Sequence, residues 1–396
     1  MEHIKVSRTS SALVIVSIVL VSLNLRPSMA AIGPLLSKIQ EEIPLSFTTA
    51  SLLTMLPVLA MGAAMFAGIR VARVIGEHRT ISLSLIMISI AAAARLFADS
   101  SYELVATAIL AGIGIALVQA VMPAIIKSKF PSNVSLVMGF YVTSIMGGAA
   151  LAASISPLVM ETMGGWRMGL GIWAVLAVIS LFVWATQSSA IDRLRTSFNN
   201  SVQDRHFLNS RSWLLAVFFG IGTASYTCVL AWLAPYYVER GWSEQSAGLI
   251  LGFVTAMEVI SGLATPAIAN YSQDRRIVLV VLLLFIISGF VGLALVPETL
   301  SLFWPCLLGI GIGGLFPMSL IVAMDHIDNP MRAGGLAAFT QGIGYLIAGL
   351  SPLFAGLVRD QFDSFEWAWL TLAGAMVLLI GLAIRFNPKH YSSYYK

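Results

Sequence analysis

The chain has 396 residues, of which 58% are hydrophobic and only 11% are charged, and its formal net charge is +4. Soluble globular proteins carry roughly 25% charged residues, so this composition excludes a soluble domain and places most of the chain against lipid or other membrane helices. The small positive charge gives no reason to expect nucleic acid as a partner, because basic residues of membrane proteins gather in cytoplasmic loops.

Apolar runs predict twelve transmembrane helices, because lipid offers no hydrogen-bonding partner to an open backbone. The predicted spans are residues 11–37, 47–69, 79–97, 102–127, 133–160, 166–187, 212–239, 245–270, 276–296, 300–325, 331–358 and 365–386. The first span has the basic start of a signal peptide. The polar break at Asn24 and Arg26 separates its apolar run from any cleavage site, so we expect it to be retained.

The second half of the sequence repeats the first at a spacing of about 197 residues. The matching segments are Ser46–Leu53 with Ser243–Ile250, Gly112–Ile115 with Gly309–Ile312, and Ser156–Leu158 with Ser351–Leu353. Two similar membrane halves are typical of a transporter that moves one half against the other around a central site. We therefore predict an all-α membrane protein with two pseudo-symmetric six-helix bundles, residues 1–187 and 212–396. The polar segment 188–211 is predicted to be a cytoplasmic linker.

The distribution of basic residues predicts the orientation in the membrane. With the N-terminus inside, 17 of the 23 Lys and Arg residues lie at the inner side and Arg26 lies within a span. The five outer ones are Lys38, Arg95, Arg167, Arg240 and Arg359. This bias places both termini and the linker in the cytoplasm. The glycine-rich fifth and eleventh spans are expected to be a matching pair of bending elements.

Arg26 is the strongest candidate functional residue, because charge inside a span is costly and usually functional. About fifteen apolar residues precede it in the first span, which is roughly 22 Å of helix. Its planar guanidinium suits a carboxylate, a nitro group or a similar planar group, so we predict that Arg26 anchors the substrate. The alternatives are a structural bond to helix carbonyls and an outward-reaching side chain.

Glu258 lies in the middle of the eighth span. A buried carboxylic acid can carry a proton near neutral pH, because burial disfavours its charged form. Glu258 is therefore a candidate for proton coupling. It could instead be the counter-charge to Arg26, or a protonated side chain that only packs between helices.

Five further residues are candidates for substrate binding or for the cavity wall. Gln119 and Gln341 offer amide donors and acceptors within apolar spans, although bonds between helices would explain them as well. Tyr226 and Trp232 of the seventh span could form an aromatic wall, or face lipid. Asn24 precedes Arg26 in the first span.

The inner loop after the second span carries Arg70, Arg73 and Arg79, which could form an inner-gate latch together with Asp325 of the tenth span. The alternative is ordinary positive-inside charge. The five histidines lack the spacing of metal ligands, and the sequence contains no phosphate-binding loop for ATP. We therefore expect no metal and no cofactor.

The twelve-span plan with Gly68, Arg73 and Arg79 in the first inner loop resembles the major facilitator superfamily. The loop departs from that family's pattern at Ala72, where an acidic residue is usual, and at Gly76, which sits one residue late. Other segments are similar to the branch of cyanate porters and 2-nitroimidazole exporters. They are Asn24–Pro27, Gly33–Leu36, Leu53–Val58, Gln119–Pro123, Ala231–Pro235 and Gln341–Tyr345.

This resemblance implies a secondary active transporter of small planar, polar or weakly anionic solutes in the bacterial cytoplasmic membrane. It implies alternating access, a monomer in the lipid bilayer, and protons as a candidate coupling ion. A broader drug or metabolite exporter is an alternative within transport. Outside transport, a membrane-embedded enzyme would need a catalytic cluster that we do not find, and a solute sensor would need a longer cytoplasmic tail.

Overall fold

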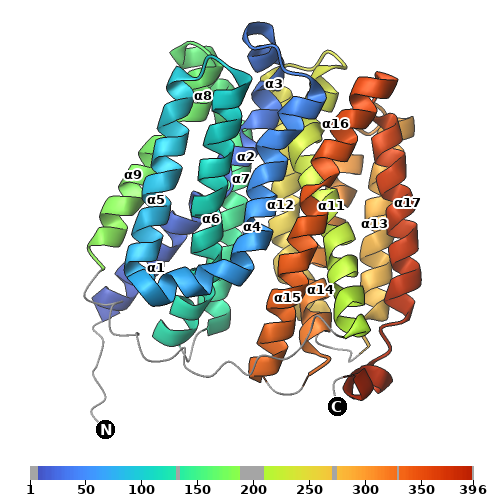
Figure 1. Ribbon diagram of the computed structural model, residues 1–396. Helices are drawn as coiled ribbons and strands as arrows, with labels where there is room; N and C mark the ends of the chain where they lie inside the picture. The colour runs from blue at the N-terminus through green and yellow to red at the C-terminus, as the bar shows by residue number, and fades with distance from the viewer. Residues whose placement is uncertain (1–7, 131–133, 188–208, 270–273, 328–329, 395–396) are drawn as a thin grey trace.

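The computed structural model describes residues 8–130, 134–187, 209–269, 274–327 and 330–394. The secondary structure of this part of the chain is helical, and its helices stand side by side as two bundles (Figure 1). Twelve segments within it are long and apolar enough to cross a membrane. The predicted fold class and number of spans are confirmed. Most of the predicted linker, residues 188–208, lies outside the described residues.

The first bundle contains nine α-helices and one short 3₁₀ helix within the described residues. They are α1 (Arg8–Leu23), α2 (Pro27–Ala30), α3 (Ile32–Glu42), α4 (Phe47–Ile75), α5 (Glu77–Ala94), η1 (Arg95–Phe97), α6 (Ser101–Lys129), α7 (Val134–Met163), α8 (Trp166–Gly171) and α9 (Trp173–Ala185).

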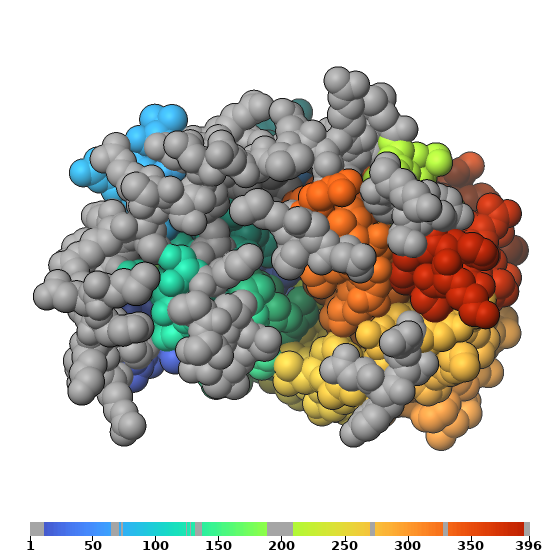
Figure 2. All heavy atoms as spheres, turned by 90° about the horizontal axis from the view of Figure 1, so that it is seen from below, coloured from blue at the N-terminus to red at the C-terminus, as the bar shows by residue number. Residues whose placement is uncertain are grey.

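The second bundle follows the same order. It consists of α11 (Ser210–Val238), α12 (Glu244–Ala269), α13 (Arg276–Leu295), α14 (Phe303–Met324), α15 (Pro330–Gly349), α16 (Ser351–Phe362), α17 (Glu366–Ile384) and η4 (Pro388–Tyr394). The start of α1 and the 3₁₀ helix η4 lie at the same end of the molecule (Figure 1). We call this the termini end and the other the far end. Figure 2 views the molecule from the termini end, with the two halves side by side.

The first predicted span is broken rather than continuous. Helix α1 ends at Leu23, and Arg26 precedes the short helix α2, which begins at Pro27. Proline has no N–H and disfavours a helical conformation of the residue before it, so it interrupts the helix here. The Asn24 side chain donates to the carbonyl oxygen of Leu20 at 2.7 Å and to the Ser180 hydroxyl at 2.8 Å, which braces the break against α9.

The fifth and eleventh spans do not bend in the same way. Helix α7 runs without interruption through Pro157, whereas the eleventh span divides at Leu350 into α15 and α16. In both places the proline follows a serine, but only in the second half does the helix end before it. The two spans therefore differ in helix continuity at their matching prolines.

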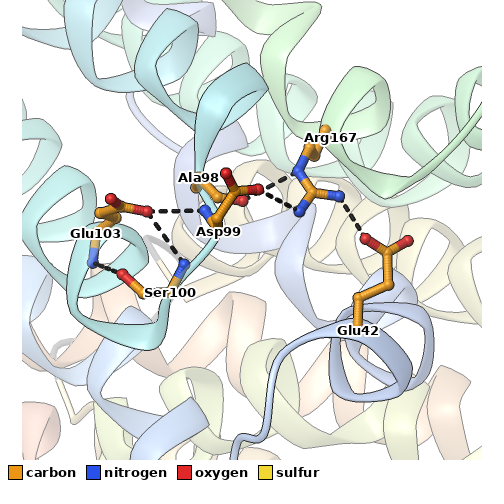
Figure 3. A network of polar contacts seen from close by, with 6 residues as sticks. All are labelled: Glu42, Ala98, Asp99, Ser100, Glu103 and Arg167. Atoms are coloured by element: carbon orange, nitrogen blue, oxygen red, sulfur yellow. Dashed lines mark hydrogen bonds and ion pairs between the residues drawn. The ribbon is translucent and has the colours of Figure 1, made fainter.

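The far end of the first half is held by a network around Arg167, shown in Figure 3. Its guanidinium pairs with Glu42 of α3 and with Asp99, at 2.8 Å, and donates to the carbonyl oxygen of Ala98 at 3.0 Å. Arg167 holds the pKa of Glu42 below its usual value. The network links α3, α8 and the turn before α6 at this end of the bundle.

The second half carries a related clamp. Glu239 stands 197 residues after Glu42 and accepts from Arg359 of α16 at 2.9 Å. Burial nevertheless raises the pKa of Glu239 above its usual value, although the nearby arginine opposes this. In both halves, therefore, a glutamate that follows the first span forms an ion pair with an arginine at the far end.

Candidate functional site: a cavity between the two halves

A cavity of about 260 Å³ lies between the two halves. Its wall comes from α7, α11, α12 and α14, and the start of α2 contributes Arg26. The polar side chains in the wall are Arg26, Thr143, Thr223, Tyr226, Glu258 and Ser319. The wall continues along α14 to its last residue, Met324, which lies at the termini end. The cavity therefore extends from the break in the first span toward that end.

Arg26 occupies the break in the first span and is only 3% exposed. Its guanidinium carbon lies 5.1 Å from the centre of the Tyr226 ring, in cation–π geometry. Its Nε atom is buried and has no hydrogen-bond partner. A buried guanidinium with an unused donor at a cavity is suited to bind an acceptor group of a solute.

Glu258 reaches the same cavity from α12 and is 4% exposed. Helix α14 packs closely behind it, because a Cβ at Gly313 would overlap the Glu258 backbone. The Oε2 atom of Glu258 is buried without a partner, and no nitrogen of Arg26 lies within ion-pair distance of the carboxylate in the described structure. A direct Arg26–Glu258 ion pair, one of the alternatives left by the sequence, is not formed.

Tyr226 completes a group of three polar side chains on one cavity. It is 6% exposed, and its hydroxyl is buried without a partner. Buried polar groups are normally hydrogen-bonded, so three unsatisfied atoms around one cavity call for an explanation. A bound polar solute or ordered water would supply the missing partners.

The other predicted binding residues are not among the side chains that line this cavity. Asn24 braces the break in the first span, as described above. Gln341 donates to the Tyr345 hydroxyl at 3.2 Å, and the Trp232 indole donates to the Pro352 carbonyl oxygen at 2.9 Å. Gln119 is half-buried in α6, and it is not among the cavity-lining residues.

Of the predicted inner-gate residues, the structure describes the side chains of Asp325 and Arg79, and these two form no contact with each other across the halves. Asp325 pairs with Arg275 of its own half at 3.3 Å, while Arg79 is exposed on α5. The side chains of Arg70 and Arg73 lie outside what the structure describes.

Next to Asp325, the His326 ring stays neutral. It accepts from Arg211 Nε at 3.0 Å and lies 2.6 Å from the Val322 carbonyl oxygen. Burial lowers the pKa of His326 to about 4. This histidine therefore belongs to the packing at the base of the second half.

Sequence reasoning missed two aspects of the site. Phe219, Phe316 and Pro317 line the cavity, although none of them was predicted to bind solute. A signal for Phe316 was its place two residues after the glycine run of the tenth span. Arg95, expected at an outer helix end, is instead 2% exposed. It donates to the Ser28 carbonyl oxygen at 2.8 Å and to Thr107 at 3.0 Å.

Comparison with known proteins defines the class to which this fold and cavity belong. The family model described as Major Facilitator Superfamily matches residues 18–349, so the chain belongs to this superfamily of membrane transporters. It is a multi-pass membrane transporter, and the membrane-embedded enzyme considered from the sequence is excluded.

Two curated relatives place the chain in the expected branch. It is 36% identical to the cyanate transport protein CynX of Escherichia coli (strain K12) over 374 residues, which cover 94% of this chain and 97% of the relative. It is 27% identical to the 2-nitroimidazole transporter of the same organism, over 93% of each chain. The resemblance seen in the sequence is confirmed.

Solved structures show the same fold at low sequence identity. The nucleoside transporter NupG (D323A mutant) aligns with a TM-score of 0.76 at 13% identity, over 94% of this chain and 99% of that one. The inward-open xylose transporter XylE from E. coli aligns with a TM-score of 0.74 at 14% identity, over 94% and 95% of the two chains. At such identities the likeness concerns the fold alone.

Proposed function

We propose that this protein is a secondary active transporter of a small planar, polar or weakly anionic solute, similar to cyanate or a nitroimidazole. It works by alternating access in the bacterial cytoplasmic membrane, with both termini in the cytoplasm. The observation that carries the proposal is Arg26, buried at a cavity between the halves with an unused donor. The curated relatives named for cyanate and 2-nitroimidazole transport support the choice of solute.

The geometry suggests how the solute would be held and moved. The Arg26 guanidinium binds an acceptor or anionic group, and Tyr226 shields it from one side. Phe219 and Phe316 supply flat apolar surface, with ring centres 5.2 Å apart. Because residues of both halves line the cavity, a bound solute gains contacts when the halves close over it. Those added contacts favour the closed state through which the transporter must pass.

Proton coupling through Glu258 forms part of the proposal. The carboxylic acid lines the cavity that holds Arg26, so its charge and the charge of the solute act on the same guanidinium. A proton on Glu258 leaves Arg26 free to attract an anion, whereas an ionised Glu258 competes with it. Solute and proton would then occupy the cavity together.

The size of the cavity favours a ring-sized solute such as a nitroimidazole over cyanate, and it keeps the broader exporter as a second candidate. A volume of about 260 Å³ far exceeds the needs of a triatomic anion, since a water molecule takes about 30 Å³ in the liquid. The walls are largely apolar apart from the six polar side chains named above. A ring-sized solute fits these features better than bare cyanate does.

Substitution of Arg26 tests the proposed function. Charge-assisted hydrogen bonds contribute about 1.5–3 kcal/mol, so Arg26→Gln should weaken solute binding by about ten- to hundredfold. Binding is measured by ligand-induced thermal shift of purified protein, and counterflow in vesicles with labelled cyanate and labelled 2-nitroimidazole identifies the solute. Arg26→Lys keeps the positive charge but loses the planar, forked donors of the guanidinium, so it should retain part of the binding.

Arg79→Gln is the matched control, because Arg79 is exposed and far from the cavity wall. It should bind and transport like the unmodified chain. If Arg26→Gln folds and transports normally, Arg26 does not anchor the solute. If neither compound gives counterflow in the unmodified chain, a wider set of planar solutes replaces them.

A further inference from the structure

The far end of the cavity is closed by direct contacts between the halves. Helix α4 of the first half runs against α15 and α16 of the second, and α3 and α7 approach α12. Ser37 of α3 donates to Glu244 at 3.1 Å. Solute in the cavity therefore has no open route past these contacts, which must separate before it can leave at the far end.

One of these contacts is a carboxylate that caps a helix of the other half. Asp360 of α16 accepts the backbone N–H groups of Phe47 at 3.1 Å and Thr48 at 2.9 Å, and the Thr48 hydroxyl at 2.5 Å. The first N–H groups of a helix have no partner within it, and the helix dipole attracts negative charge there. Asp360 therefore satisfies two donors that α4 cannot satisfy itself.

The first residue of α4 is also held by aromatic rings of the second half. The Phe47 ring lies 5.7 Å from Trp232 and 5.6 Å from Phe365, measured between ring centres. The Arg359 guanidinium lies 4.9 Å from the Phe47 ring centre. Gly356 permits the close approach, because a Cβ there would lie 2.7 Å from the Phe47 carbonyl oxygen. Phe47 is thus inserted into the second half directly beside the cap.

The repeat shows that this cap is particular to one side. The corresponding helix α12 begins after Ser243, whose own hydroxyl accepts from the Ser246 N–H at 3.1 Å. Gly165 stands 195 residues before Asp360 and offers no carboxylate to α12. In the first half, the Ser46 hydroxyl accepts only the N–H of Thr49. The acceptor for the N–H groups of Phe47 and Thr48 is Asp360 of the second half. The internal symmetry therefore does not explain Asp360.

We propose that Asp360, with Phe47 and Thr48, forms a far-end latch that keeps the transporter closed on the side opposite the termini. Opening on that side requires Asp360 to release the N-terminus of α4 and Phe47 to leave its aromatic surroundings. The latch stabilises the arrangement seen here, with the cavity directed toward the termini end. The inference rests on alternating access in the proposed function, but it needs no particular solute.

Accessibility of the cavity from the far end tests the latch. Thr143 lines the cavity and becomes the reporter as Thr143→Cys, in a background of Cys228→Ala and Cys306→Ala. A membrane-impermeant maleimide is applied from the side opposite the termini. Adding Asp360→Ala should raise the labelling rate about tenfold, because the lost bonds stabilise only the closed far end. Asp360→Asn keeps a hydrogen-bond acceptor but loses the charge. Its labelling rate should therefore lie between that of the reporter alone and that of the reporter with Asp360→Ala.

Asp363→Ala is the matched control. Asp363 lies three residues further along, is 94% exposed at its side chain and pairs with Arg359 within the same half. Its labelling rate should equal that of the reporter alone. Equal rates for Asp360→Ala and Asp363→Ala would overturn the latch.

Thr48→Val is a milder second variant in case Asp360→Ala does not fold. It removes only the hydroxyl bond to Asp360, so it should still raise the labelling rate, by a smaller factor. No increase in folded Thr48→Val, together with an unfolded Asp360→Ala, also counts against the latch. The assay contains no solute. An increase in labelling without cyanate or nitroimidazole counterflow would therefore support the latch while rejecting the proposed solutes.

Discussion

Three of the polar side chains in the cavity wall come from distant parts of the sequence and are left with unsatisfied atoms. Arg26, Tyr226 and Glu258 come from the first, seventh and eighth spans, and each leaves a buried polar atom without a partner. The sequence indicated Arg26 and Glu258 because charges within spans are rare and costly. What it could not show is that they share a cavity without pairing. In the structure they are two separate, unpaired groups in the wall of one cavity.

The separation of these charges leads to a prediction for Glu258. Glu258→Gln keeps the shape of the side chain and mimics its protonated form. We expect it to bind an anionic solute as well as the unmodified chain does, but to lose pH-driven uptake or export, by about tenfold or more. Transport with and without a pH gradient in vesicles provides the measurement. Unchanged pH-driven transport in Glu258→Gln would remove this residue from the coupling mechanism.

At the scale of helices, the broken first span determines where Arg26 lies. Arg95 from η1 supports the break by donating to the Ser28 carbonyl oxygen, two residues beyond Arg26. It also donates to Thr107, which joins η1 to α6. Its Nη2 atom is buried without a partner, so the charge is not fully compensated. A buried cation at this position is costly. Its two hydrogen bonds hold the segment after the break, so we infer a supporting role for Arg95.

Arg95→Met should disturb the break while filling a similar volume. Loss of two bonds costs about 1–3 kcal/mol of stability, partly offset because an incompletely paired charge is also removed. Solute affinity should fall as well, since the segment carrying Arg26 loses its support, and Arg95→Lys should restore part of it. Thermal unfolding in detergent and solute titration measure the two effects. Reduced stability with unchanged affinity would mean that Arg95 only supports packing.

The helices also show why only some of the residues predicted from the sequence line the cavity. Position along a span gives depth in the membrane, and it correctly put Arg26, Tyr226 and Glu258 deep within the protein. It does not give the direction around the helix, which depends on packing. Gln119, Gln341 and Trp232 have comparable polar or aromatic character, yet they do not line the cavity. The break in the first span was readable from Pro27, but its stabilisation by Asn24 and Arg95 depends on distant residues.

Across the whole molecule, the fold followed from sequence because its signals are strong and repeated. Twelve apolar runs and a spacing of about 197 residues predicted two bundles, and the second-half clamp on Glu239 keeps that spacing from Glu42. The relation between the bundles is less accessible to sequence. Contacts such as that of Asp360 with α4 break the internal symmetry, and we propose that they decide which end is closed.

The completeness of the cavity within one chain predicts a monomer. All its described lining residues, and the far-end contacts, belong to the two halves of a single polypeptide, so no second copy is needed to build the site. Native mass spectrometry from detergent should give a species of 42.4 kDa apart from bound lipid or detergent. A stable species of twice that mass, kept at high dilution, would show an obligate dimer instead.

The single carboxylate on α16 has a consequence for the direction of the transport cycle. A duplicated chain whose halves were identical would have no reason to rest facing one compartment rather than the other. Asp360 has Gly165 as its counterpart, so the proposed latch has no equivalent on the other side of the pseudo-symmetric pair. We expect it to bias the empty transporter toward the state that is closed opposite the termini, before any solute or ion gradient acts.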